Sequence, residues 1–203
     1  MTNELSSFGD HAVVTMQSNV KAPEGMGVEG WYHVVCRDAQ GNVKWEEGFP
    51  NLVVAVGKQL LLDTLMRGSS YTTVGPFLGL ISNTFTASAS DTMTSHTWTE
   101  FTAYTVGGSA IRGTAVFGAS SSSGSTPANV TTSTASAITY TITGAGGTVY
   151  GCFLVTGSGA VSTQSSTAGV LYSEGLFSVA KATTAGDTVS VTYSTTATSS
   201  QEP

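Results

Sequence analysis

Most apolar segments of the chain are short, and clusters of Gly, Ser, Thr, Asn or Asp separate them. Residues 28–36 form the first such segment, and 38–42 then predict a hairpin loop before a return strand that starts at Val43. Further strands are expected at 76–81, 98–105, 110–117, 137–143, 149–156, 170–179 and 188–194. Apolar and polar residues alternate clearly in 138–142 and 189–193, a pattern typical of strands with one buried face.

A single segment, 57–68, has a helical pattern. Its apolar side chains recur at the spacing of one helical turn and are Leu61, Leu62, Leu65 and Met66. Arg67 falls in the last turn, and Gly68 follows it as a C-terminal cap. A helix of about eleven residues is not stable in isolation, so we expect it to lie against a sheet.

Two strands before this helix and seven after it, all closely spaced, predict an all-β fold. We expect an antiparallel β-sandwich, jelly-roll-like, because an α/β fold would need further helices between the strands. The expected organisation is an N-terminal arm at 1–25, one domain at 26–194 and a flexible, polar tail at 195–203. The serine tract at 120–123, with Gly124 and Pro127 after it, is expected to be a loop at one tip of the sandwich.

Composition points to a protein that assembles with others. Only 10% of the 203 residues are charged, compared with roughly 25% in an ordinary domain, while Ser and Thr together supply 59 residues and Gly 24. A surface with so few charges is poorly protected against association. The net charge is −6 and the seven basic residues form no cluster, so nothing suggests a nucleic-acid partner.

Neither a membrane segment nor an export signal is expected. No apolar run approaches the roughly 18 residues of a membrane helix. The first ten residues, MTNELSSFGD, lack the basic and apolar regions of a signal peptide. We therefore expect Cys36 and Cys152, each within an apolar strand, to be buried free thiols, with a disulfide as the alternative. Only His33 lies near either cysteine, so no metal site or cofactor is predicted.

The candidate catalytic residues are few. Asp91, Ser95 and His96 lie within six positions and would form a triad in a hydrolase, but neighbouring residues of an extended loop point apart. A carboxylate pair for sugar hydrolysis would have to come from Glu46, Glu47, Asp63 and Asp91. We interpret Glu46 and Glu47 instead as an exposed acidic hairpin end beside Lys44.

Other candidate binding residues also have a structural interpretation. Trp31, Trp45 and Trp98 could stack on a sugar or a base, although tryptophans in strands more often belong to a core or an interface. The glycine-rich stretch at 144–151 lacks the lysine of a phosphate loop and precedes a strand. We predict no catalytic residue, and therefore not an enzyme.

An ordered set of segments resembles a group of structural proteins from the virions of tailed bacteriophages. The first segment is VKWEEGFPNLVV (43–54), followed by the predicted helix. The others are LGLIS (78–82), DTMTSHTWTEFTAY (91–104), VYGCFLV (149–155), GVLYSEGLFS (169–178) and AGDTVSVTY (185–193). No single segment is a mechanistic signature, and the resemblance, which spans about 28–194, carries no catalytic residue with it.

The resemblance implies a capsid decoration or cement protein. Such a protein would bind the outer shell through the major capsid protein and stabilise the joints between capsid subunits. It would be made in the cytoplasm of the bacterial host and form a homo-oligomer, a dimer or a trimer, on the virion. Two other classes stay open. One is a tail-fibre or receptor-binding module that recognises a host glycan, and the other is an enzyme such as a glycan depolymerase.

Overall fold

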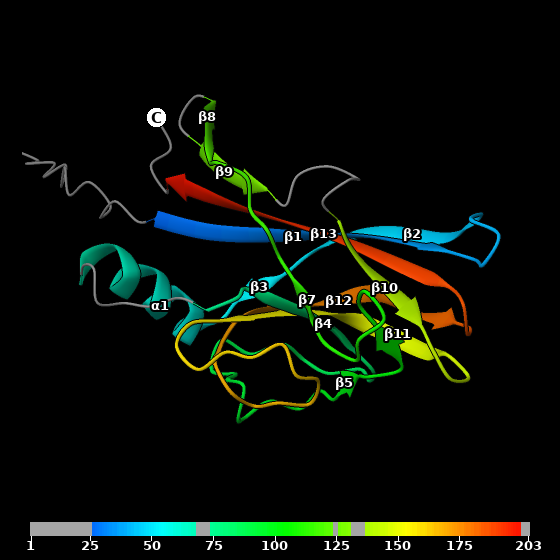
Figure 1. Ribbon diagram of the computed structural model, residues 1–203. Helices are drawn as coiled ribbons and strands as arrows, with labels where there is room; N and C mark the ends of the chain where they lie inside the picture. Colours follow the sequence, from blue (N-terminus) through cyan, green and yellow to red (C-terminus); the bar gives the residue numbers. More distant parts are fainter. Residues whose placement is uncertain (1–25, 68–73, 124–125, 131–136, 200–203) are drawn as a thin grey trace, which may run out of the picture.

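The computed structural model describes residues 26–67, 74–123, 126–130 and 137–199. Within them, two antiparallel sheets pack face to face, with one helix at one end of the sandwich (Figure 1). The prediction of an all-β antiparallel sandwich with one short helix is confirmed. The predicted arm at 1–25 lies outside the described residues, as does the predicted helix cap at Gly68.

The first sheet has the path β2-β1-β13-β10-β6, with β9 paired to β13 and β8 to β9. Its strands are β1 (Met26–Arg37), β2 (Val43–Pro50), β6 (Tyr104–Thr105), β8 (Ser121–Ser123), β9 (Thr126–Val130), β10 (Ile138–Ile142) and β13 (Thr188–Ser199). Buried and exposed residues alternate along β10 because only one face of this sheet packs on the core. The hairpin between β1 and β2 turns at Gly41, where φ is +87°.

The second sheet has the path β3-β12-β11-β4-β5, with β7 paired to β4. Its strands are β3 (Leu52–Val53), β4 (Phe77–Ile81), β5 (Glu100–Phe101), β7 (Gly113–Thr114), β11 (Gly147–Thr156) and β12 (Val170–Thr183). The last six residues of β11, Gly151–Thr156, are buried without alternation. Side chains from the loops 82–99 and 157–169, such as Trp98 and Ala160, cover the outer face of this sheet.

The main core lies between the sheets and contains hydroxyl groups as well as apolar side chains. Tyr140 donates a hydrogen bond of 2.7 Å to the carbonyl of Leu78 in the opposite sheet. Tyr32 of the first sheet lies 3.0 Å from the hydroxyl of Ser173 in the second. Each buried tyrosine hydroxyl thus has a partner across the sandwich, which avoids the cost of an unsatisfied polar group.

The helix α1 (Ala55–Met66) begins two residues earlier than predicted and packs on β12 through its first half. Gly57 lies so close to the main chain of Tyr172 that a side chain there would collide with it. Leu60 is buried, whereas the predicted apolar residues Leu62, Leu65 and Met66 are exposed. The helix lies against a sheet as expected, but of the predicted apolar residues only Leu61 packs on the core, because the second half of α1 extends beyond the strand ends (Figure 1).

Two predicted strands are shorter than the sequence suggested. The segment 98–105 contains β5 and β6, which belong to different sheets because the chain crosses the sandwich between them. In the segment 110–117 only Gly113–Thr114 pairs as a strand. Both segments are rich in apolar residues because they cross or border the core, although only short parts of them pair as strands.

The serine tract and the tail also differ from expectation. Ser121–Ser123 is a strand, β8, because β9 lies beside β13 and offers its free edge for pairing. The predicted tail at 195–203 is wrong for its first five residues, which continue β13 to Ser199 and pair with Met26–Gly30 of β1. Residues 200–203 lie outside the described part.

Candidate functional site

The structure does not assemble Asp91, Ser95 and His96 into a triad. Residues 92–95 form a tight turn, with an isolated bridge between Thr92 and Ser95. His96 stacks face to face on the indole of Trp98, with ring centroids 3.6 Å apart, and its buried Nδ1 has no hydrogen-bond partner. The imidazole thus lies flat against an aromatic ring and forms no hydrogen bond through Nδ1 to Ser95.

Three of the four candidate carboxylates lie on separate elements with separate partners. Glu46 lies 2.8 Å from the imidazole of His33, and Glu47 lies 2.7 Å from Lys181. Asp63 pairs with Arg67 along α1 at 3.6 Å. The fourth, Asp91, has a buried Oδ2 without a hydrogen-bond partner among the described residues and lies close enough to Glu174 to raise the pKa of that carboxyl group.

The expected exposed acidic hairpin end beside Lys44 holds for Glu46 only. Glu47 is largely buried and accepts a hydrogen bond of 2.6 Å from the backbone N–H of Ser178. Burial raises the pKa of its carboxyl group, but the hydrogen bonds from Lys181 and Ser178 lower it by more, so the pKa is lowered overall. Lys44 pairs instead with Asp187, at 2.6 Å.

The three tryptophans have three different environments. Trp98 is buried between His96 and Phe153, so neither of its faces is open to a ligand. Trp45 donates from its indole N–H to the carbonyl of Ala182 and packs edge-on against Phe177. Trp31 is 47% exposed on the outer face of the first sheet. Of the three, only Trp31 presents a large exposed surface to a partner.

Both cysteines are buried free thiols, as predicted. Burial raises the pKa of Cys36 to about 11 and that of Cys152 well above its ordinary value. Each thiol is therefore protonated at neutral pH and unreactive as a nucleophile. Among the residues that the structure describes, no three His, Cys, Asp or Glu side chains gather as a metal site would require.

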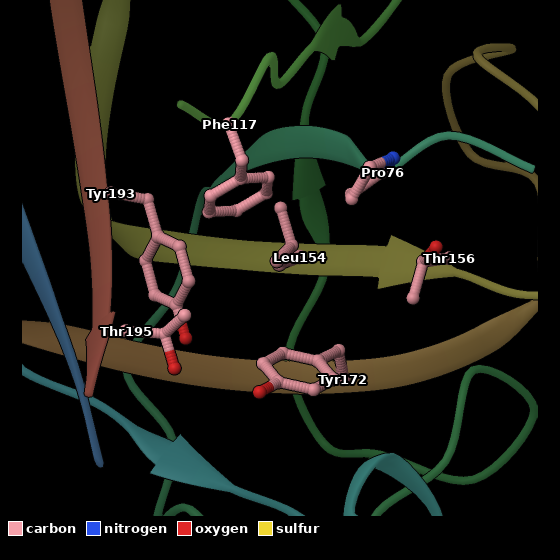
Figure 2. A pocket seen from close by; sticks show the side chains of 7 residues that line it. All are labelled: Pro76, Phe117, Leu154, Thr156, Tyr172, Tyr193 and Thr195. Atoms are coloured by element: carbon pink, nitrogen blue, oxygen red, sulfur yellow. The ribbon is translucent and has the colours of Figure 1, made fainter. Parts of the chain in front are cut away.

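An apolar pocket of about 180 Å³ opens between the sheets at the end of the sandwich that carries α1 (Figure 2). Its lining comes from both sheets and from two connecting segments, and consists of Pro76, Phe117, Leu154, Thr156, Tyr172, Tyr193 and Thr195. Thr156 at the end of β11 donates a hydrogen bond to the carbonyl of Val74. This bond holds the segment before β4 beside the pocket.

Exposed apolar side chains lie on α1, at the same end of the sandwich, and on the segments that contain the pocket residues Pro76 and Phe117. Leu65 and Met66 of α1 are 65% and 74% exposed, and Val116, next to Phe117 of the pocket lining, is 67% exposed. Leu62 and Val74 are exposed as well. We call the pocket together with Leu62, Leu65, Met66, Val74 and Val116 the apolar end. Several large exposed apolar side chains at one end of a folded domain are a feature of interaction sites.

A network of charged residues, which the sequence pattern does not predict, lies beneath the loop 82–99. Arg112, with only 1% of its side chain exposed, pairs with Glu100 through Nε at 3.0 Å and Nη2 at 2.7 Å. Nearby, Glu174 accepts the indole N–H of Trp98 at 2.7 Å and the backbone N–H of Ser88 at 3.2 Å. The available signal was a lone charged residue within a predicted strand, since Arg112 lies in the predicted strand 110–117 and Glu174 in 170–179.

Comparisons of the chain with protein-family models, with curated proteins and with solved structures found no match. In the described part of the chain, α1 has 12 residues, and no helix has the length and apolar character that crossing a membrane requires. The described residues thus contain two candidate sites: the apolar end of the sandwich, and a buried polar network on the outer side of the second sheet.

Proposed function

We propose that this chain is a structural virion protein that binds the outer capsid shell and stabilises the joints between capsid subunits, without catalysis. The observation that carries the proposal is the apolar end, where exposed apolar side chains and an open apolar pocket lie at the same end of the sandwich. The ordered segment resemblance described above supports the phage assignment. The partners are the major capsid protein and further copies of this chain, as a dimer or a trimer.

The chemistry of the apolar end suits a contact that must persist. Burying exposed apolar side chains contributes free energy without desolvating ions, and fully burying a Leu or Met side chain contributes about 1.5–3 kcal/mol. The open pocket, lined mainly by apolar atoms, offers a recess for a side chain of the shell protein. Repetition of one modest contact over a symmetric shell then gives strong retention, because each protein that binds at two points gains effective concentration.

A binding assay on capsids that lack this protein tests the proposal. Wild-type protein is expected to co-sediment with such capsids, whereas Leu65→Glu combined with Met66→Glu should weaken binding at least about 30-fold, the equivalent of about 2 kcal/mol. Val43→Glu is the matched control, because Val43 is also exposed (48%) but lies at the β1–β2 hairpin, at the opposite end of the sandwich (Figure 1). Equal thermal unfolding of all variants would exclude misfolding as the cause.

Two results would overturn the proposal. One is a wild-type protein with no affinity for the capsids, and the other is a low copy number in purified virions by quantitative mass spectrometry. A ratio near that of the major capsid subunit supports a position across the shell. A handful of copies would place the protein in the tail and favour a receptor-binding role.

A further inference from the structure

A second cavity, of about 160 Å³, lies on the outer side of the second sheet. Unlike the pocket of the apolar end, it is lined by many polar and charged side chains. Its lining residues are Met93, His96, Trp98, Thr99, Glu100, Arg112, Ser165, Ser166 and Thr167. The floor is buried and includes Trp98, Glu100 and Arg112, whereas Thr99, Ser165 and Thr167 are exposed at the rim. The cavity therefore has three hydroxyl-bearing residues on its exposed side.

Arg112 contributes a hydrogen-bond donor that nothing in the described protein satisfies. Its guanidinium lies over the ring of Phe153, 5.0 Å from the centroid, and its Nη2 donates to Glu100 and to the carbonyl of Ser166. The remaining nitrogen, Nη1, is buried without a partner. A buried donor left unpaired costs free energy, so a ligand oxygen that accepts from Nη1 is favoured there.

His96 contributes a second unsatisfied group. Its Nδ1 is buried and has no partner, and burial lowers the pKa of the imidazole, so the ring is neutral at pH 7. In a neutral imidazole one nitrogen donates and the other accepts, depending on the tautomer. A ligand hydroxyl can do either, so it matches Nδ1 in both tautomers.

Charge and size limit the ligand further. Glu100 already neutralises Arg112 through two hydrogen-bonded nitrogens, which leaves no net positive charge in the cavity for an anion. A cavity of about 150 Å³ is known to hold a six-membered ring. The occupant that fits best is therefore a neutral ring that bears several hydroxyl groups.

The rim is held in place at a conformational cost. Ser165 has φ +60°, and among the described residues no other non-glycine residue has a positive φ. Its backbone N–H donates to Oε2 of Glu100 at 2.7 Å, so the buried ion pair fixes the rim loop in this conformation. Such strained backbone is concentrated at functional sites in proteins.

We propose that this cavity binds one neutral pyranose unit of a carbohydrate, with a sugar hydroxyl between Nη1 of Arg112 and Nδ1 of His96. Ser165 and Thr167 at the rim carry hydroxyl groups that can form hydrogen bonds with further hydroxyls of the sugar. This binding site goes beyond capsid attachment and does not rest on it, since it lies on different residues from the apolar end. It would allow a shell protein to hold a glycan.

Saturation-transfer NMR and calorimetry on the full chain test this site with glucose, galactose, mannose and N-acetylglucosamine, and with glucuronate as the charged comparison. At least one neutral sugar should bind, more tightly than glucuronate. His96→Phe keeps the ring stacked on Trp98 but removes Nδ1, and should weaken binding at least tenfold. His33→Phe is the matched control, because His33 lies on the first sheet beside Glu46, and it should bind like wild type.

A second pair of variants keeps the test valid if His96→Phe does not fold. Thr167→Val should weaken sugar binding at least threefold, while Thr163→Val, at an exposed position of the same loop outside the cavity lining, should not. The proposal is overturned if no sugar of the panel binds, if glucuronate binds best, or if binding is unchanged in both cavity variants. An array of immobilised glycans then distinguishes the two sources of the sugar. Binding of the protein to the array indicates recognition of a cell-surface polymer, and binding in solution only indicates recognition of a free sugar.

Discussion

The buried charged residues show how much depends on a few side chains in a chain with so little charge. Arg112 and Glu100 are nearly inaccessible to solvent, and Tyr104 and the backbone of Ser165 add hydrogen bonds to the same carboxylate. Removing one partner of such a pair leaves an uncompensated buried charge, which costs about 3–5 kcal/mol. The sequence shows both residues but not their pairing, because the crossing of the chain between the sheets decides what lies beside Arg112.

Glu174 should make the stability of the fold depend on pH. Burial raises the pKa of its carboxyl group from 4.5 to about 7, while the hydrogen bond from Trp98 acts in the opposite direction and Asp91 raises the pKa further. Because the folded protein binds this proton more tightly than the unfolded chain, the stabilisation is present below about pH 4.5 and is lost as pH rises through 7. A shift of this size corresponds to about 3 kcal/mol.

Denaturant unfolding of wild type and Glu174→Gln from pH 4 to pH 8 measures this effect. Glutamine keeps an acceptor for Trp98 but does not titrate, so the wild type should lose about 3 kcal/mol relative to the variant across this range. His96, whose pKa burial lowers, has an effect of opposite sign that is common to both proteins and cancels in the difference. Parallel pH profiles would contradict the prediction, and Glu46→Gln, at an exposed site, is the control.

At the scale of elements, the hydrophobic pattern predicts the strands and, for the two alternating segments, a sheet with one buried face. The two alternating segments belong to β10 and β13 of the first sheet, which has one open face. The nearly continuous apolar run of β11 lies in the second sheet, which is covered on both faces. The pattern could not predict the break between β5 and β6, because both the strand and the crossing segment consist of buried residues.

The helix provides a direct test of which of its leucines hold it to the sheet. Leu60 is 4% exposed and Leu65 is 65% exposed, although both are leucines in the same helix. Leu60→Ala should lower the free energy of unfolding by about 2–5 kcal/mol, because it leaves a cavity against β12. Leu65→Ala should change it by no more than about 0.5 kcal/mol, as is usual for exposed positions.

Chemical denaturation of the two variants measures the difference. Both replace Leu by Ala, so the change in helix propensity is the same for each. Equal losses of stability would mean that Leu65 also packs against the fold, which would contradict its exposure and weaken its proposed role in binding the capsid.

At the scale of the whole molecule, the class of fold was predictable and the two candidate surfaces were not. Short apolar segments with one helix are enough to indicate a sandwich. The polar cavity, in contrast, joins residues near 96, 112 and 166, and the apolar pocket joins Pro76, Phe117 and Tyr172. Only the order of strands in the two sheets brings such distant segments together, and a periodicity within a segment contains no information about its neighbours in space.

The C-terminal half of β13 should be essential to the sandwich, contrary to what its polar sequence suggests. Residues 195–199 pair with Met26–Gly30, and Thr195 donates to the carbonyl of Glu29 and lines the apolar pocket. A chain that ends at Ser194 loses this ladder and exposes the edge of β1, at a cost of about 2 kcal/mol or more, since each lost hydrogen bond contributes about 0.5–1.5 kcal/mol. Its melting temperature should fall by at least about 4 °C, whereas a chain that ends at Ser199 should melt like the full protein. Equal melting of both truncated chains in calorimetry would contradict this prediction and show that residues 195–199 contribute nothing to stability.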